Sequence, residues 1–141
     1  MTQTPSTVVF VSLTGDEEIK VYDLDSSSGA LRLRTTNPAH GPSGALFLHP
    51  TLDVLYDAHV ESTTLASFRL NKTTGQVTLL NSVDTGIGIP AHSITDSQGR
   101  YLLTAYYGGG GITVHRLGSD GSISQQVQHV QTGPKAHAVH I

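Results

Sequence analysis

The residues best suited to chemistry in this chain are its eight histidines, whereas cysteine is absent. An imidazole titrates between about pH 5 and 8, so it can give or take a proton under physiological conditions. The lack of cysteine excludes disulfides, thiolate catalysis and cysteine-based metal sites. His137 and His140 are three residues apart, which places them on opposite faces of a strand and makes them a poor metal pair. We therefore expect no metal and no other cofactor.

A repeat of about 46 residues sets out the elements that must position these histidines. Tyr22 and Phe68 are 46 residues apart at matching places in the repeat, and a turn glycine recurs at the same interval. Apolar residues alternate with period two between turn signals, so each copy predicts four short antiparallel strands, which is typical of a propeller blade. In every copy two strands are linked by the same 13-residue spacing: Val9 to Tyr22, Leu55 to Phe68, and Leu102 to His115.

The predicted strands divide the chain into a tail, three blades and one spare strand. Residues 1–7 form the tail and 8–141 a partial propeller domain. Its parts are blade 1 at about 8–36 with three strands, blade 2 at about 44–84, blade 3 at about 92–130, and the first strand of a further blade at 136–141. Propellers close with about four to eight blades, and three alone would leave strand edges unpaired. A homodimer formed by exchange of the terminal strands is therefore expected.

Three motifs in the second half of the chain carry a family resemblance. They are Pro90-Ala91-His92, the turn Gly99-Arg100, and Ala105-Tyr106-Tyr107-Gly108-Gly109. Together they resemble the lactonase family of seven-bladed propellers, which includes propeller-type 6-phosphogluconolactonases and carboxymuconate-cyclising enzymes. The resemblance extends over about residues 8–141 and implies an all-β fold, with about three blades of a seven-bladed ring.

The chain departs from the family pattern at three places. Tyr106 stands where the family has Asn before Tyr-Gly-Gly, and His59-Val60 replaces an Asn-Glu pair. Near the end, Lys135 replaces the first histidine of a Pro-His-x-His segment, of which His137 is the second. These substitutions bear on activity and not on the fold.

By this resemblance the chain acts on a small anionic lactone or its open-chain acid, by hydrolysis or cyclisation through metal-free general acid–base chemistry. His92 and His137 begin innermost strands, at the end that opens on the central channel, where propellers bind ligands. The resemblance gives His137 the acid or base role and His92 a role in orienting or binding substrate. It makes Lys135 or Arg100 the contact for the anionic group, and Tyr106 a further substrate-binding residue. The alternative for both histidines is that they only cap strand ends.

Composition excludes other classes of partner. The net charge is −3 and no basic run is present, so nucleic acid is not expected. The apolar run Val8 to Val11 is too short for a signal peptide or a membrane span, which predicts a soluble, cytoplasmic protein with no membrane partner. The glycines of residues 107–111 lack the Gly-Lys-Ser pattern of a phosphate loop and predict a hairpin.

Three hypotheses of function stay open on the sequence. The first is the lactonase-family enzyme segment described above. The second is a non-catalytic propeller that serves as a binding platform, because fold does not determine function. The third is an inactive, truncated gene product, since three repeats fall short of a ring.

Overall fold

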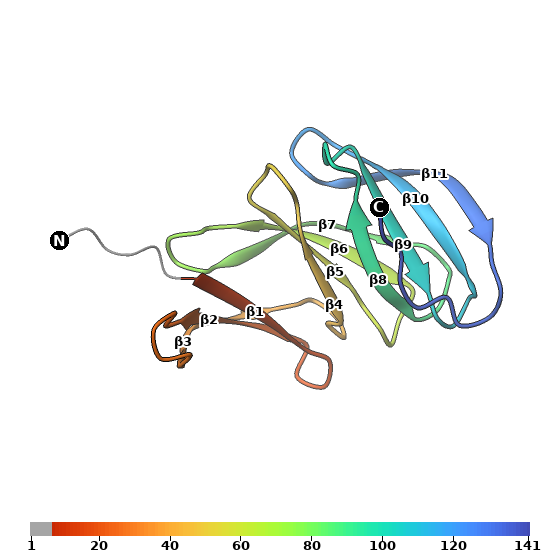
Figure 1. Ribbon diagram of the computed structural model, residues 1–141. Coiled ribbons are helices and arrows are strands. Elements are labelled where there is room, and N and C mark those ends of the chain that lie inside the picture. The colour runs from red at the N-terminus through yellow and green to blue at the C-terminus, as the bar shows by residue number, and fades with distance from the viewer. Residues whose placement is uncertain (1–6) are drawn as a thin grey trace.

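The computed structural model describes residues 7–141, and within them all regular structure is β. Eleven strands form three separate antiparallel sheets, one for each predicted blade (Figure 1). The sheet of blade 1 contains β1 (Thr7–Leu13), β2 (Glu18–Leu24) and β3 (Leu31–Pro38). No helix in the described part of the chain is long and apolar enough to cross a membrane.

Blades 2 and 3 have four strands each, in simple up-and-down order. The sheet of blade 2 consists of β4 (Ala45–Leu48), β5 (Val54–Ala58), β6 (Thr64–Leu70) and β7 (Val77–Asp84). The sheet of blade 3 consists of β8 (Pro90–Thr95), β9 (Tyr101–Tyr106), β10 (Gly111–Leu117) and β11 (Ile123–Gln131). The all-β propeller-blade fold predicted from the repeat is thus confirmed.

The register of the strands explains the 13-residue spacing. Its members are direct cross-strand partners in all three blades: Val9 pairs with Tyr22, Leu55 with Phe68, and Leu102 with His115. A two-residue side-chain period on each strand then keeps each pair on one face of its sheet. The spacing is constant because the hairpin between these two strands has the same length in every blade.

Apolar side chains between neighbouring sheets hold the blades together. Ile19 of blade 1 packs with Leu55 and Phe68 of blade 2, all 1% exposed or less. On the other face of blade 2, Tyr56 and Leu65 pack with buried apolar side chains of blade 3, among them Leu102. Burial of a large apolar side chain is worth roughly 1.5–3 kcal/mol, so these two layers stabilise the packing of the blades against one another.

An asparagine side chain, buried at Asn37 and half-buried at Asn81, also links each pair of blades through the backbone. Asn37 of β3 accepts from the Val77 N–H (3.1 Å) and donates to the Gly75 carbonyl (3.2 Å) of blade 2. Asn81 of β7 accepts from the Ile123 N–H (3.0 Å) and donates to the Ile123 carbonyl (2.7 Å) of blade 3. Each amide satisfies backbone groups at the start of the next outermost strand, which fixes one sheet against the next.

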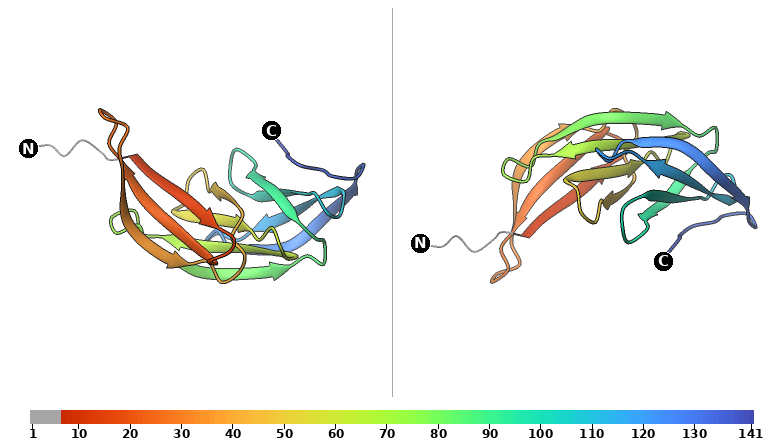
Figure 2. Two further views of the ribbon diagram at one scale, coloured as in Figure 1. Left: turned by 90° about the horizontal axis from the view of Figure 1, so that it is seen from below. Right: turned by 90° about the horizontal axis from the view of Figure 1, so that it is seen from above.

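The three sheets follow one another round an arc, with blade 1 at one end and blade 3 at the other (Figure 2). The predicted innermost strand at 136–141 is not formed, and this segment has no regular structure. A strand needs a neighbouring strand for its backbone hydrogen bonds. In this structure the segment follows the end of β11 and returns over blade 3, where it pairs with no strand.

Candidate active site

His92 lies in the first half of β8, the innermost strand of blade 3. The strand begins at Pro90, and its pairing with β9 is irregular between Pro90 and His92, which pairs with Ala105. Ile89, just before the strand, has a positive φ of 55°, which is a strained conformation for a β-branched residue. The Ile89 N–H donates to the Ser62 carbonyl (3.2 Å) of blade 2, which holds this turn in place.

The C-terminal segment brings two further histidines to His92. Thr132 anchors the segment, because its N–H and its hydroxyl both donate to the Gly110 carbonyl at 2.9 Å. The Val139 N–H then donates to Nδ1 of His92 (3.4 Å), and the His140 ring lies 5.0 Å from the His92 ring between centroids. His137 and His140 are exposed, whereas His92 is half-buried.

Tyr107, which follows β9, contacts both His137 and Lys135 of the C-terminal segment. The His137 ring stands edge-on to the Tyr107 ring at 5.7 Å, and Nζ of Lys135 lies 5.9 Å from the Tyr107 centroid. We call His92, His137, His140, Tyr107 and Lys135 the histidine cluster. Among the predicted site residues, His92, His137 and Lys135 are therefore brought together.

The glycine hairpin after Tyr107 packs closely against the turn before β8. A Cβ on Gly108 would lie 2.8 Å from the Gly88 carbonyl oxygen, and Gly110 has a φ of 70°, so side chains are excluded here. The Tyr107 N–H donates to the Ile89 carbonyl (2.8 Å), which ties the hairpin to the turn before β8. The predicted hairpin thus accounts for these glycines.

Burial and charge both favour the neutral form of His92. Partial burial lowers its pKa below the usual 6.5, and the neighbouring imidazoles of His140 and then His137 lower it further, since like charges would repel; the backbone hydrogen bond with Val139 acts in the opposite direction and does not outweigh them. The N–H of Val139 can donate only to an unprotonated Nδ1. The single proton of the neutral ring is then on Nε2.

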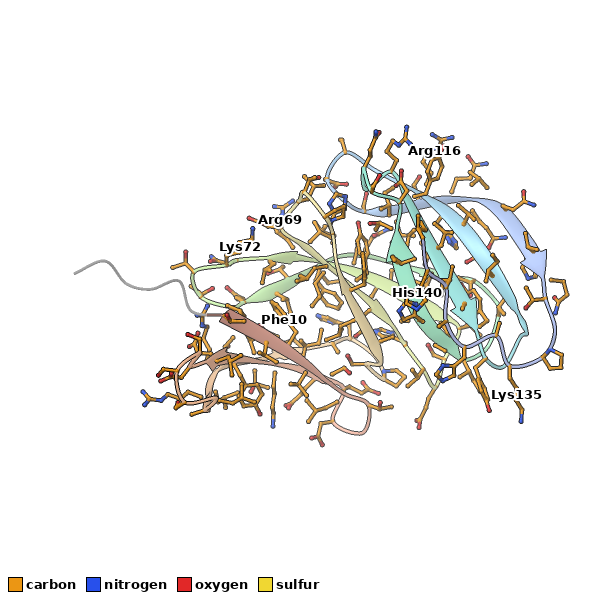
Figure 3. All side chains as sticks on the ribbon, in the orientation of Figure 1. Phe10, Arg69, Lys72, Arg116, Lys135 and His140 are labelled. Atoms are coloured by element: carbon orange, nitrogen blue, oxygen red, sulfur yellow. The ribbon has the colours of Figure 1, made fainter. Side chains whose placement is uncertain are left out.

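Two predicted site residues lie elsewhere. Arg100 is in the turn after β8, where its Nε donates to Asp96 Oδ2 (3.1 Å) and its guanidinium lies 5.9 Å from the Tyr101 ring centroid. At roughly 3.3 Å per residue along a strand, this turn is about 13 Å from His92. Arg116 contacts the same Tyr101 ring, and Figure 3 shows Arg116 and Lys135 at opposite ends of blade 3. The structure does not bring Arg100 to the histidine cluster.

Tyr106 is fully buried and does not face the cluster. Its hydroxyl is within hydrogen-bond distance of Thr113 Oγ1 (3.0 Å), and burial raises its pKa. It points into the blade because it has the same parity on β9 as Leu102 and Thr104, which are both buried. The structure therefore does not bring Tyr106 to the histidine cluster, and its contact with substrate stays a prediction.

A second polar group, not anticipated from the sequence, lies at the corresponding end of blade 2. Asp57 is 1% exposed and accepts from the Ser43 hydroxyl (2.5 Å) and the Gly44 N–H (2.9 Å). His59 Nε2 is 3.6 Å from Asp57 Oδ2, is buried and makes no hydrogen bond. We call Ser43, Asp57 and His59 the carboxylate cluster. Within residues 7–141 no three His, Cys, Asp or Glu side chains converge in an arrangement that could hold a metal ion.

The sheets and their arrangement define a class of protein, the β-propellers built from four-stranded antiparallel blades. Within that class, residues 6–140 match the model of the family described as "Lactonase, 7-bladed beta-propeller". The chain belongs to this family.

Relatives within the family are 6-phosphogluconolactonases. The chain is 30% identical over 135 residues to the 6-phosphogluconolactonase of Serratia proteamaculans and 27% identical over 138 residues to that of Pectobacterium carotovorum. Both matches cover 95% of this chain but only 40% of the relative. The chain thus spans about two fifths of the length of these curated relatives.

Solved structures share the fold at lower identity. A Bacteroides fragilis protein superimposes with a TM-score of 0.82 at 20% identity, over 93% of this chain and 38% of its own. The periplasmic gluconolactonase PpgL of Pseudomonas aeruginosa superimposes with a TM-score of 0.75 at 19% identity, over 92% of this chain and 40% of its own. Three blades of this chain therefore correspond to less than half of a complete ring.

Proposed function

We propose that the chain contributes to the hydrolysis of a small anionic sugar-acid lactone by general acid–base chemistry without a metal. The observation that carries this proposal is the histidine cluster, which brings His137 of the C-terminal segment close to His92 of β8, the innermost strand of blade 3. Membership of the lactonase family supports lactone hydrolysis as the reaction class.

His137 is the residue we propose as general base. Its exposed ring takes a proton from water while the water oxygen attacks the lactone carbonyl carbon. The tetrahedral intermediate then breaks the bond between that carbon and the ring oxygen. The imidazolium returns the proton to the departing oxygen, which yields the hydroxy acid. The reverse sequence would close the ring and is the cyclisation alternative.

His92 serves in this proposal as a hydrogen-bond donor to the carbonyl oxygen. Its Nδ1 accepts from the Val139 N–H, which leaves the Nε2 proton to be donated. A donor aimed at the developing oxyanion stabilises the transition state. Lys135 is the proposed contact for the anionic group of the substrate, because it is the one cation of the cluster defined above.

The decisive test is an assay of 6-phosphogluconolactone hydrolysis by the 141-residue chain and by its His137→Ala and His92→Ala variants. The proposal expects turnover above the spontaneous rate and its loss in both variants. His129→Ala is the matched control, because His129 is an exposed histidine on β11 outside the cluster. Activity that survives both cluster substitutions, or that a chelator abolishes, would contradict the proposal.

A non-catalytic binding platform is the second candidate. Two observations favour it: Arg100 is paired with Asp96 away from the cluster, and Tyr106 is buried where the family pattern has Asn. It predicts that a sugar acid perturbs the NMR signals of His92 and His137 while no lactone is hydrolysed. An inactive truncated product predicts neither effect.

We further propose a cytoplasmic location, which the charge and the short apolar run at residues 8–11 favour. A family neighbour is described as periplasmic, so the alternative has a precedent in the fold. Fractionation of cells that produce a tagged chain separates the two locations.

A further inference from the structure

The turn that leads into β8 is held from both sides by backbone hydrogen bonds. On the blade-2 side, the Thr85 N–H donates to the Thr63 carbonyl (2.9 Å). The Ile89 N–H donates to the Ser62 carbonyl (3.2 Å), and on the blade-3 side the Ile89 carbonyl accepts from the Tyr107 N–H (2.8 Å). β8 starts where β9 ends, so the turn and the glycine hairpin lie side by side (Figure 1). The backbone of Ile89 is therefore fixed between two four-stranded blades.

The backbone of Ile89 is also strained, and core packing does not account for the strain. Its φ of 55° lies in the left-handed region, which is costly for a β-branched residue and free of strain for glycine. Burial of the side chain could offset this cost, but Ile89 is 44% exposed. Ile87 of the same turn, in contrast, is half-buried against Gly109 of the hairpin. Strained residues of this kind are concentrated at ligand-binding and active sites.

The Ile89 side chain lies beside the residues proposed to act on substrate. It packs over the glycine hairpin, since a Cβ on Gly108 would be 3.1 Å from Ile89 Cγ1. Tyr107, the neighbour of Gly108 in the hairpin, is 37% exposed. His92 is three residues further along the chain, which is at most about 10 Å of strand. Apolar and aromatic surface thus lies next to the imidazole that can donate a hydrogen bond.

We propose that Ile89 is a specificity-determining residue, whose side chain packs with the Tyr107 ring against the C–H face of a six-membered sugar lactone. This inference rests on the proposed function, because it places the ring where His92 can donate to the lactone carbonyl. Sites for small ligands combine apolar and aromatic walls with a few polar groups that orient the ligand. The exposed apolar surface of Ile89 leaves water when the ring binds, which favours binding, and its fixed backbone limits the ordering that binding requires.

Binding of glucono-δ-lactam tests this contact without hydrolysis, because the amide of its six-membered ring resists opening. The lactam is titrated into the chain labelled at its isoleucine methyl groups, and the signals are followed by NMR. The Ile89 methyl signals should shift on binding. The dissociation constant should rise about 10-fold in Ile89→Ala, the usual effect of removing apolar contact from a pocket. Ile89→Val keeps the branched side chain and should bind close to the parent.

A comparison of Ile89→Ala with Ile89→Gly separates the side chain from the backbone. Alanine retains the strain of the positive φ, whereas glycine relieves it. The proposal expects the same loss of binding in both variants, together with a higher melting temperature in Ile89→Gly. Weaker binding with higher stability is a combination that a purely structural residue does not give. Weaker binding in Ile89→Gly alone, or a lower melting temperature of that variant, would overturn the proposal.

Leu33→Ala is the matched control for the loss of an exposed apolar side chain. Leu33 is 57% exposed on β3 of blade 1, at the other end of the arc from blade 3 (Figure 2). This variant should bind the lactam as the parent does. An equal loss of binding in Leu33→Ala, or no binding of the lactam to the parent chain, would overturn the contact.

Binding and turnover together distinguish this inference from the proposed function. If the chain hydrolyses no lactone but Ile89→Ala weakens lactam binding, the contact is supported and the reaction is rejected. If the chain is active and Ile89→Ala changes neither lactam binding nor the KM for 6-phosphogluconolactone, the contact is rejected and the reaction stands.

Discussion

The carboxylate cluster of blade 2 and the histidine cluster of blade 3 lie at the same end of neighbouring repeats, yet they differ in access. His59 is 2% exposed, and Asp57 beside it is occupied by the hydroxyl of Ser43 and the N–H of Gly44. His137 is exposed, and His92 is only half-buried. The polar side chains at this end of blade 2 are thus buried and hydrogen-bonded to one another, whereas those of blade 3 are ionisable groups at an open surface.

The comparison shows that polar side chains at the same end of neighbouring blades can differ in their access to solvent. In blade 2 the loop before β4 returns onto Asp57, and the Thr14 hydroxyl donates to the Ser43 carbonyl (2.8 Å), so this loop is held over the cluster. In blade 3 the C-terminal segment, which forms no strand, contacts His92 and leaves His137 and His140 exposed. Access, more than residue type, separates the two histidine environments.

The largest expected effect is on the stability of the closed end. Asp57→Ala removes a buried carboxylate and leaves the Ser43 hydroxyl and the Gly44 N–H without their acceptor. Breaking a buried charged network costs about 3–5 kcal/mol. Urea unfolding followed by circular dichroism measures the loss. Asp53→Ala is the control, because its ion pair with Lys72 is more than half exposed and is worth under about 1 kcal/mol.

The next effect is on chemistry at the open end. His137→Ala should lower lactone turnover by about 10²-fold, the usual contribution of a positioned acid–base group, while the urea midpoint stays within error of the parent. Steady-state kinetics and unfolding curves on the same preparations check both expectations. If His137→Ala unfolded the chain as Asp57→Ala is expected to, the contrast between the clusters would fail.

A smaller effect concerns protonation. His92 should titrate below 6.5 in an NMR pH series, because burial and the charges of His140 and His137 disfavour its cation. Its contribution to folding is therefore complete above pH 6.5 and declines as the pH falls from there through the lowered folded-state pKa. His140→Ala should move the midpoint of His92 upward. An unchanged midpoint would remove His140 from the electrostatics of the cluster.

The smallest effect is on the turn that leads into β8. Ile89→Gly relieves a positive φ at a β-branched residue and should raise the free energy of unfolding by up to about 1 kcal/mol, after the entropy of glycine is offset. Ile87→Gly, at a residue of the same turn without a positive φ, should lower it. Thermal melts of the two variants, which should shift in opposite directions, measure the difference.

The order of the strands and their register could be predicted from the sequence, because both depend on local patterns. Period-two alternation, turn glycines and the 13-residue spacing describe each hairpin without reference to the rest of the chain. β5 (Val54–Ala58) and β6 (Thr64–Leu70), for example, form the hairpin that the spacing from Leu55 to Phe68 predicts. The predicted strand at 136–141 is absent, and no strand of the described residues pairs with this segment.

The composition of the site was decided only by the tertiary structure. The position of His92 could be predicted from its motif. Arg100, however, lies in the turn beyond the other end of β8, and the ring of Tyr106 is buried within the blade. The C-terminal segment returns over blade 3, and this brings His140 to His92 and His137 to Tyr107. Ser43, Asp57 and His59 likewise come together from separate parts of blade 2. Alternation and spacing determine which residues share a strand face, whereas the approach of segments far apart in the chain depends on how whole sheets pack.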